Sequence, residues 1–85
     1  MNFEFDPGKD TANVRKHGLS LGDFDGFDTQ PVIVADDRAD YGEMRYRAFG
    51  LIDGIGYSVA FTVRGESWRL ISFRRAHAKE LRRYE

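Results

Sequence analysis

Residues 44–73, MRYRAFGLIDGIGYSVAFTVRGESWRLISF, decide the fold of this chain. Asp53-Gly54 is the strongest short hairpin signal, and it separates two runs rich in aromatic and β-branched residues, 44–52 and 55–64. Gly65-Glu66 is a second two-residue turn signal, and residues 67–73 follow it with a similar composition. The segment therefore predicts three consecutive antiparallel strands, a β-meander.

Two-residue turns fix the register of these strands, because the residues on either side of each turn pair directly. One face is then nearly all apolar and is predicted to face the core: Met44, Tyr46, Ala48, Gly50, Tyr57, Val59, Phe61, Val63, Trp68 and Leu70. The other face is divided between an apolar and a charged end. Toward Asp53-Gly54 it carries Phe49, Ser58, Ala60, Ile71 and Phe73, and at the opposite end Glu43, Arg45, Arg47, Thr62, Arg64 and Arg69.

Arginine is concentrated at that opposite end. Arg45, Thr62 and Arg69 share one predicted cross-strand row, and Glu43 and Arg64 share the next. Like charges this close disfavour a sheet unless a carboxylate or a bound anion offsets them, and Glu43 offsets only part of the cluster. We therefore predict a site for a phosphate-sized anion. The alternative is a solvated sheet face on which Glu43 and Arg64 form a surface ion pair worth at most about 1 kcal/mol.

The flanking segments add helices and two more strands. Residues 3–5 alternate as a strand and stop at a turn, Asp6-Pro7-Gly8, and residues 9–17 form a helix that Gly18 ends. Ser20 caps a second short helix from residue 21 to about 27, residues 31–35 form a strand, and the acidic run 36–40 is a loop. From about residue 76 the chain is again helical. These elements predict an α+β domain: an antiparallel β-meander with two short N-terminal helices and a C-terminal helix.

Length and composition narrow the class of protein. Eighty-five residues suit one domain spanning 1–85, and the absence of cysteine and of any long apolar run indicates a soluble, cytoplasmic protein that makes no contact with a membrane. Residues 1–43 hold four Lys or Arg against ten Asp or Glu, whereas residues 44–85 hold nine against four. Eight of those nine cations are arginine, whose planar fork suits phosphate, so the second half predicts a local basic surface.

Metal-independent cleavage of RNA would use such residues. It needs a base for the 2′-hydroxyl, cations for the phosphate and an acid for the leaving oxygen. His17 has the side chain whose usual pKa lies near neutrality, Lys9 lies on the same helix face, and Glu43 is another possible base, although the arginines around it would lower its pKa. We predict the catalytic set Lys9, His17, Glu43, Arg45, Arg64 and Arg69, with the three arginines on the phosphate. Which residue is acid and which is base stays open.

Other interpretations of the same residues remain. A histidine in the last turn of a helix often does no more than interact with the helix dipole. His17 and His77 lack metal-ligand spacing and no phosphate-binding glycine loop is present, so we predict no metal site and no cofactor. The alternative function is a non-catalytic binding module whose basic sheet face docks an acidic protein or RNA. Such a binder would tolerate His17→Ala.

Three stretches, in order, resemble the BrnT family of toxins from BrnT/BrnA toxin–antitoxin modules. The opening FEFDPGKDTANVRKHGLSL is similar to that family's Phe-Glu-Trp-Asp, Lys and Asn-x-x-Lys-His-Gly motif. Glu43-x-Arg45 followed by Gly50 is similar to its Glu-x-Arg…Gly segment, and the ending WRLISFRRAHAKELRRYE is similar to its Arg-Ile-Ile-Ser-Ala-Arg-Arg-Ala signature. In two departures, Phe5 replaces a tryptophan and Phe73 replaces a small residue. A bulky Phe73 on the divided face would narrow the cleft.

The resemblance implies a RelE-like fold and a ribonuclease that arrests translation. It also implies a cognate DNA-binding BrnA-like antitoxin, so that DNA is met only indirectly, through the toxin–antitoxin complex that represses its own promoter. The family motifs fall on Lys9, Asn13, Lys16, His17, Gly18, Glu43, Arg45, Arg64, Arg69, Arg74, Arg75, Glu80 and Tyr84. Beside the catalytic set, we predict that Lys16, Arg47, Arg74 and Arg75 bind the RNA substrate.

Overall fold

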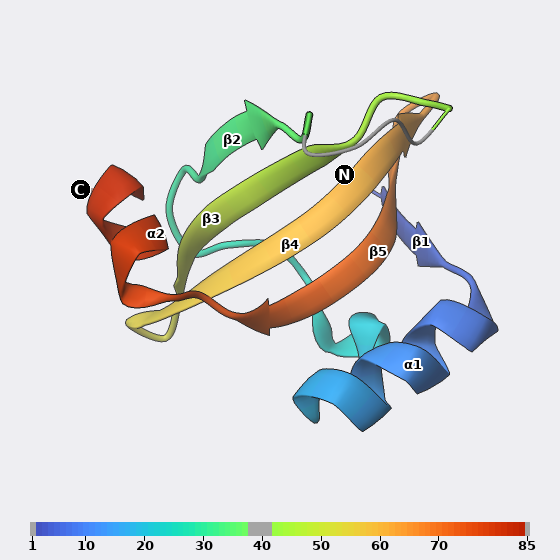
Figure 1. Ribbon diagram of the computed structural model, residues 1–85, viewed down its shortest axis with the longest axis horizontal. Helices are drawn as coiled ribbons and strands as arrows, with labels where there is room; N and C mark the ends of the chain where they lie inside the picture. Colours follow the sequence, from blue (N-terminus) through green and yellow to red (C-terminus); the bar gives the residue numbers. More distant parts are fainter. Residues whose placement is uncertain (1, 38–41, 85) are drawn as a thin grey trace.

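The computed structural model describes residues 2–37 and 42–84, which form one sheet with two helices. In chain order the elements are β1 (Asn2–Phe5), α1 (Pro7–His17), the 3₁₀ turn η1 (Leu21–Asp23), β2 (Val32–Ala35), β3 (Tyr46–Ile52), β4 (Ile55–Arg64), β5 (Ser67–Arg75) and α2 (Ala78–Tyr84). The strand order is β1-β5-β4-β3-β2 (Figure 1). The predicted α+β class is confirmed.

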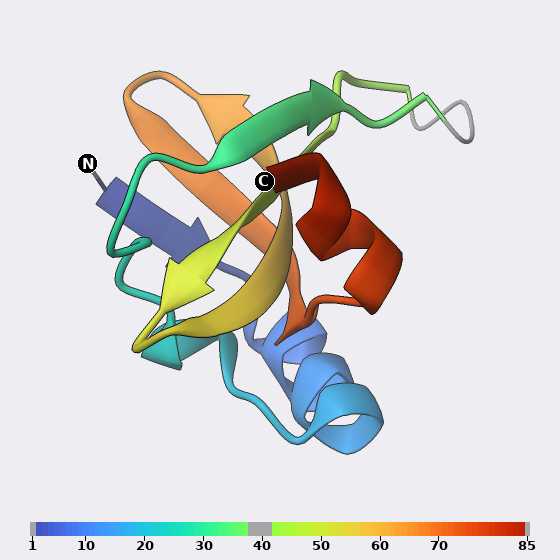
Figure 2. The ribbon, with the colours of Figure 1, turned by 90° about the vertical axis from the view of Figure 1, so that its left-hand side faces the viewer.

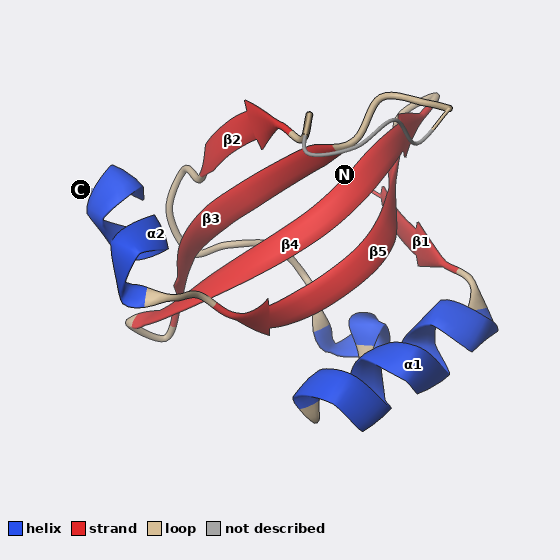
Figure 3. Ribbon diagram, in the orientation of Figure 1, coloured by secondary structure: helices blue, strands red, loops and turns tan. Residues whose placement is uncertain are grey.

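The predicted meander is present as part of a larger, mixed sheet. β2 to β5 pair antiparallel in sequence, while β1 pairs parallel with β5, in the register Asn2–Ser67 to Phe5–Leu70 (Figure 3). The antiparallel meander is therefore as predicted, and the parallel pairing of β1, for which no partner was predicted, makes the sheet mixed. No turn connects β1 with β5, so the local sequence held no signal for this pairing.

Both predicted hairpin turns are correct. Asp53 and Gly54 have φ angles of 52° and 77°, as a type I′ turn needs, and Gly65 has a φ of 60°. The register next to them is therefore the predicted one, with Tyr46 opposite Phe61 and Thr62 opposite Arg69.

Farther along β5 the predicted register is wrong because of a β-bulge. Phe61 pairs with Leu70, but Ala60 pairs with Ser72 and Val59 with Phe73, which leaves Ile71 as the extra residue. The extra residue reverses the direction of every side chain after it. Phe73 therefore points into the core and not onto the divided face, so it does not narrow a cleft there.

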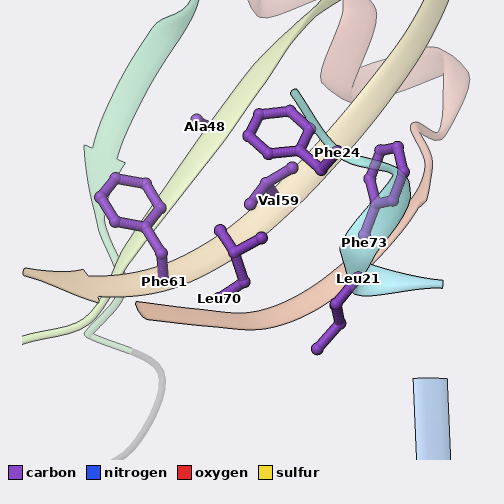
Figure 4. Close-up of a cluster of buried hydrophobic side chains, with 7 residues drawn as sticks. All are labelled: Leu21, Phe24, Ala48, Val59, Phe61, Leu70 and Phe73. Carbon is purple, nitrogen blue, oxygen red and sulfur yellow. The ribbon is translucent and has the colours of Figure 1, made fainter. Parts of the chain in front are cut away.

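The core lies between the sheet and the segment that comes after α1. Its buried cluster consists of Leu21, Phe24, Ala48, Val59, Phe61, Leu70 and Phe73 (Figure 4). The rings of Phe24 and Phe73 meet edge to face at 5.3 Å, and Phe61 stacks on Trp68 at 3.7 Å. The core stops short of one end of the predicted apolar face, because Met44 and Val63 are 63% and 53% exposed.

Two short N-terminal helices were predicted, and one α-helix is present. Asp6-Pro7-Gly8 begins α1 and is not a separate turn: the Asp6 side chain accepts a hydrogen bond from the Gly8 N–H at 2.8 Å, and Pro7 is the first helical residue. Ser20 caps the next element as predicted, but it is the three-residue η1. Phe24 and Phe27 still face the core, and Phe27 packs directly over Gly50, where a Cβ would come within 2.6 Å of its ring.

The C-terminal helix covers part of the opposite face of the sheet. Leu81 of α2 packs onto Gly56 of β4, and Figure 2 shows α2 and η1 on opposite sides of the sheet. The predicted acidic loop falls partly on residues 38–41, which lie outside the described residues. Within the described ranges, no helix is long and apolar enough to span a membrane.

Candidate active site

Asn13 fixes α1 against the edge of β5. β1 pairs with Ser67–Leu70, so among the described residues the second half of β5 has no strand on its outer side, and α1 lies there instead (Figure 1). The Asn13 Nδ2 donates to the carbonyl oxygens of Phe73 and Leu19, both at 2.8 Å, and its Oδ1 accepts from the Phe73 N–H at 3.0 Å. Asn13, which is 4% exposed, therefore satisfies the backbone N–H and carbonyl of Phe73, as a neighbouring strand would.

One helical turn after Asn13, His17 ends α1 beside two adjoining hollows. Gly18 stops the helix with a φ of 73°, and its N–H donates to the Val14 carbonyl at 2.8 Å. Lys16 and His17 line both hollows. The smaller, about 180 Å³, is completed by Lys9, Ala12, Asn13, Ile71 and Ser72, and the larger, about 470 Å³, by Arg74, Arg75 and His77.

The surroundings of His17 favour its neutral form. Partial burial lowers the pKa of the imidazole below its usual 6.5, and the positive charges of Lys16 and Arg74 lower it further. An imidazole with a lowered pKa is uncharged at neutral pH and can accept a proton. The same cations favour an anion at the hollow, so a group that can accept a proton lies beside a cationic surface.

Glu80 holds the Arg74 guanidinium in place. Nη1 and Nη2 of Arg74 donate to the two carboxylate oxygens at 2.8 and 2.9 Å, and the His77 N–H donates to Oε1 at 2.8 Å. The hydrogen bonds from Arg74 are the main reason why the Glu80 pKa falls to about 2, although burial alone would raise it. Arg47 approaches the same carboxylate at 4.0 Å. A fixed guanidinium is thus presented beside His17.

Sequence reasoning placed Glu80 among the family-motif positions but gave it no catalytic or RNA-binding role, although its spacing from His77 offers a partial signal. His77 immediately precedes α2 and Glu80 is its third residue, and Glu80 reaches back to the His77 N–H. This is the spacing of a capping box, in which the third helical residue is a glutamate. Glu80 supplies the glutamate half of such a box, and the same carboxylate is thereby held next to Arg74.

The predicted catalytic residues fall into two groups. Lys9 and His17 line the same hollow, in agreement with their helical spacing. Arg69 lies across from Thr62 and approaches Glu4 at 3.4 Å, and Arg64 is exposed beside the Gly65-Glu66 turn. Its strand partner Ser67 is seven residues from Arg74 along β5, about 20 Å away at the usual strand rise.

The remaining predicted residues precede or lie within β3. Glu43 is exposed and Arg45 is half-buried, and both come just before Tyr46, which pairs with Phe61. They therefore lie at the same end of the sheet as Arg69. Arg47 lies on the Arg74 side, with its guanidinium 5.4 Å from the centre of the Phe49 ring. The structure thus brings Lys16, Arg74 and Arg75 to His17, but not Glu43 or Arg64.

Comparison with known protein families identifies the chain. A model of the ribonuclease toxin BrnT, of type II toxin–antitoxin systems, matches residues 5–80. The chain belongs to this family. The matched range includes every residue that lines the two hollows. No curated protein matches the chain.

Family membership states the function at a general level. BrnT proteins are ribonuclease toxins, which implies an RNA substrate and an antitoxin partner for this chain as well. The hollows around His17, with an imidazole among cationic groups, offer the chemistry that such an activity needs. Among the described residues, no three carboxylate, imidazole or thiol side chains are grouped to hold a metal ion.

Proposed function

We propose that this BrnT protein is a metal-independent endoribonuclease whose active site is the pair of hollows around His17. The single observation that carries the proposal is the convergence of His17 with Lys16, Arg74 and Arg75 at one place, from α1 and from the end of β5. Cationic side chains in that number attract a phosphodiester and repel a divalent cation. Neutral imidazole beside them can start the reaction without a metal.

In the proposed mechanism His17 is the general base. It takes the proton of the ribose 2′-hydroxyl, and the 2′-oxygen attacks the adjacent phosphorus as the bond to the 5′-oxygen breaks. The products are a 2′,3′-cyclic phosphate and a 5′-hydroxyl, with solvent at the open mouth of the hollow as the source of the leaving group's proton. Arg74 and Arg75 stabilise the charge that develops on the phosphate, and Lys9 and Lys16 add to it.

The other arginines then bind RNA on either side of the scissile phosphate. Arg47 is the nearest of them to Arg74, since both approach Glu80. Arg45, Arg64 and Arg69 lie toward the far end of the sheet, so we assign them to flanking phosphates and not to the reacting one. Glu43 lies with them, and for that reason we assign the base to His17.

The wider cellular role follows the family. We propose that the chain is a single toxin domain of RelE-like fold, that cleavage arrests translation, and that a DNA-binding BrnA-like antitoxin neutralises it. Arg74 and Arg75 are exposed enough at the hollow to be the surface that an acidic antitoxin segment would cover.

The test is RNA cleavage by purified protein in EDTA. We expect the wild type to cleave and His17→Ala to lose about 10²-fold or more in rate, as loss of a general base does. The cleavage rate of Arg74→Ala should also fall steeply. Arg15→Ala is the control and should keep the wild-type rate, because it removes an exposed cation of α1 that lines neither hollow. Cleavage that needs added Mg²⁺, or equal rates for the wild type and His17→Ala, would contradict the proposal. Binding without cleavage would favour the non-catalytic module.

A further inference from the structure

A single buried amide clamps the chain on both sides of the proposed site. The three hydrogen bonds of Asn13 reach Leu19, two residues after His17, and Phe73, the residue before Arg74. The imidazole comes from α1 and the guanidinium from β5, and the Asn13 side chain ties these two elements together beside both groups, through hydrogen bonds to a residue 60 positions away in sequence. Its position controls how the two groups face each other.

The chemistry of this clamp is specific to asparagine. Oδ1 accepts one hydrogen bond, while both hydrogens of Nδ2 are donated, so the amide is used on both of its ends. An aspartate would lose both donors, and a glutamine would add a methylene and move α1 away from β5. The length of the asparagine side chain therefore sets the distance between α1 and β5, and its amide makes the hydrogen bonds between them.

A second, separate attachment holds the first half of α1. Asp10 Oδ1 accepts from the Ser20 hydroxyl at 2.9 Å and from the Leu21 N–H at 2.7 Å. This link joins α1 to η1 and does not touch β5. Two side chains of α1 thus anchor the helix, and of these two it is Asn13 that bonds to the strand that carries Arg74.

We propose that Asn13 is a positioning residue of the nuclease: it holds His17 at its working distance and angle from the phosphate-binding end of β5. This inference rests on the proposed function, because it assigns Asn13 to the same site. Asn13 is buried and need not touch RNA. It acts through the placement of α1, and small displacements of a reacting group can cost about 10²-fold in rate.

The first test compares Asn13→Ala with Asp10→Ala, each assayed at a temperature at which both variants are folded by circular dichroism. Each removes one anchor of α1. We expect Asn13→Ala to lower kcat by about 10²-fold with KM for RNA within about 2-fold, because the cations that bind substrate remain. Asp10→Ala should lose far less. Equal losses of kcat in the two folded variants would overturn the proposal, since they would show that Asn13 supports only the stability of the helix.

The second test uses Asn13→Gln, which keeps the donors and the acceptor but lengthens the side chain. A purely structural role predicts nearly wild-type kcat wherever this variant is folded, whereas the positioning role predicts a low one. Full activity of Asn13→Gln would therefore also overturn the proposal.

The third test does not depend on cleavage. The chain has two histidines, so an NMR titration of their ring protons, assigned with His77→Gln, follows His17 directly. The charged or titratable side chains that line the hollows with it are Lys9, Lys16, Arg74, Arg75 and His77. In folded Asn13→Ala the His17 midpoint should rise from its lowered value toward 6.5, and in Asp10→Ala it should stay. An unchanged midpoint in Asn13→Ala would refute the positioning role and leave the proposed function standing. Equal cleavage by His17→Ala and the wild type would refute the proposed function and, with it, the role of Asn13.

Discussion

The two halves of β5 differ in what lies beside them. Ser67–Leu70 run between β4 and β1, with a strand on each side. Beyond the bulge at Ile71, residues 72–75 have β4 on one side and the side chain of Asn13 on the other. The first half completes the sheet, while the second leaves room at its edge for the hollows around His17. The place where the sheet loses its last strand is the place where the candidate active site lies.

The arginines of the two halves show the same difference. Arg69 and Glu4 approach at 3.4 Å with side chains 33% and 44% exposed. Arg74 and Glu80 meet through two hydrogen bonds at 2.8 and 2.9 Å, with side chains 20% and 10% exposed. An arginine–glutamate pair is thus loose and exposed in one half of β5, and fixed and partly buried in the other. Substitutions in each half should separate these energies.

Phe73→Ala should have the largest effect, because the bulge places this ring in the core. We expect the free energy of unfolding to fall by about 3–5 kcal/mol, the usual cost of removing a buried aromatic ring. Ser72→Ala, one residue away on the opposite face, is the control and should change it by less than about 1 kcal/mol. Urea unfolding measures both. Similar small losses in both variants would contradict the burial of Phe73 and, with it, the bulge at Ile71.

Glu80→Gln should rank second. It removes a charge that two hydrogen bonds from Arg74 stabilise, so we expect a loss of about 2 kcal/mol at pH 7, again by urea unfolding. The glutamine keeps the volume of the side chain, which separates the loss of charge from a loss of packing. A variant as stable as the wild type would show that α2 does not depend on this carboxylate.

The same carboxylate should shape the response of the protein to acid. Its pKa is about 2 in the folded protein and lies near 4.5 when unperturbed, so the unfolded chain binds a proton first. The stabilisation is complete above about pH 4.5 and is lost as the pH falls toward 2. The difference in unfolding free energy between wild type and Glu80→Gln should therefore shrink over that range. A constant difference would contradict the lowered pKa.

The sequence predicted the first half of β5 better than the second. The hairpin turns set the register as far as Leu70, because each turn has its own local signal, Asp53-Gly54 for the first and Gly65-Glu66 for the second. The bulge has none, since Leu70-Ile71-Ser72 suits a regular strand. The next two residues hold the clue, because without an extra residue apolar Phe73 would face outward and charged Arg74 inward. Burial of the one and hydration of the other favour the bulge.

The candidate site was predictable where it depends on helix geometry. Lys9 and His17 share a face of α1 because of their spacing, and Gly18 ends the helix where the sequence indicated. The residues of β5 that lie beside His17 could not be predicted, because their position depends on non-local packing. β1 ends opposite Leu70, and Asn13 takes the place of the next strand. For that reason the arginines that line the hollows beside His17 are Arg74 and Arg75, and not the cluster near Arg64.

Glu4→Gln should have the smallest effect on stability and completes the comparison of the two halves. The Arg69–Glu4 pair is half-exposed and has a single long contact, so solvent screens most of its energy. We expect the unfolding free energy to change by less than about 0.5 kcal/mol, within the range for exposed ion pairs. Removing this carboxylate leaves Arg69 available to a phosphate, so RNA binding by Glu4→Gln should be equal to or tighter than that of the wild type in a low-salt filter-binding assay. A loss near that of Glu80→Gln would show that both halves of β5 use their ion pairs in the same way, because the energy would then not follow burial.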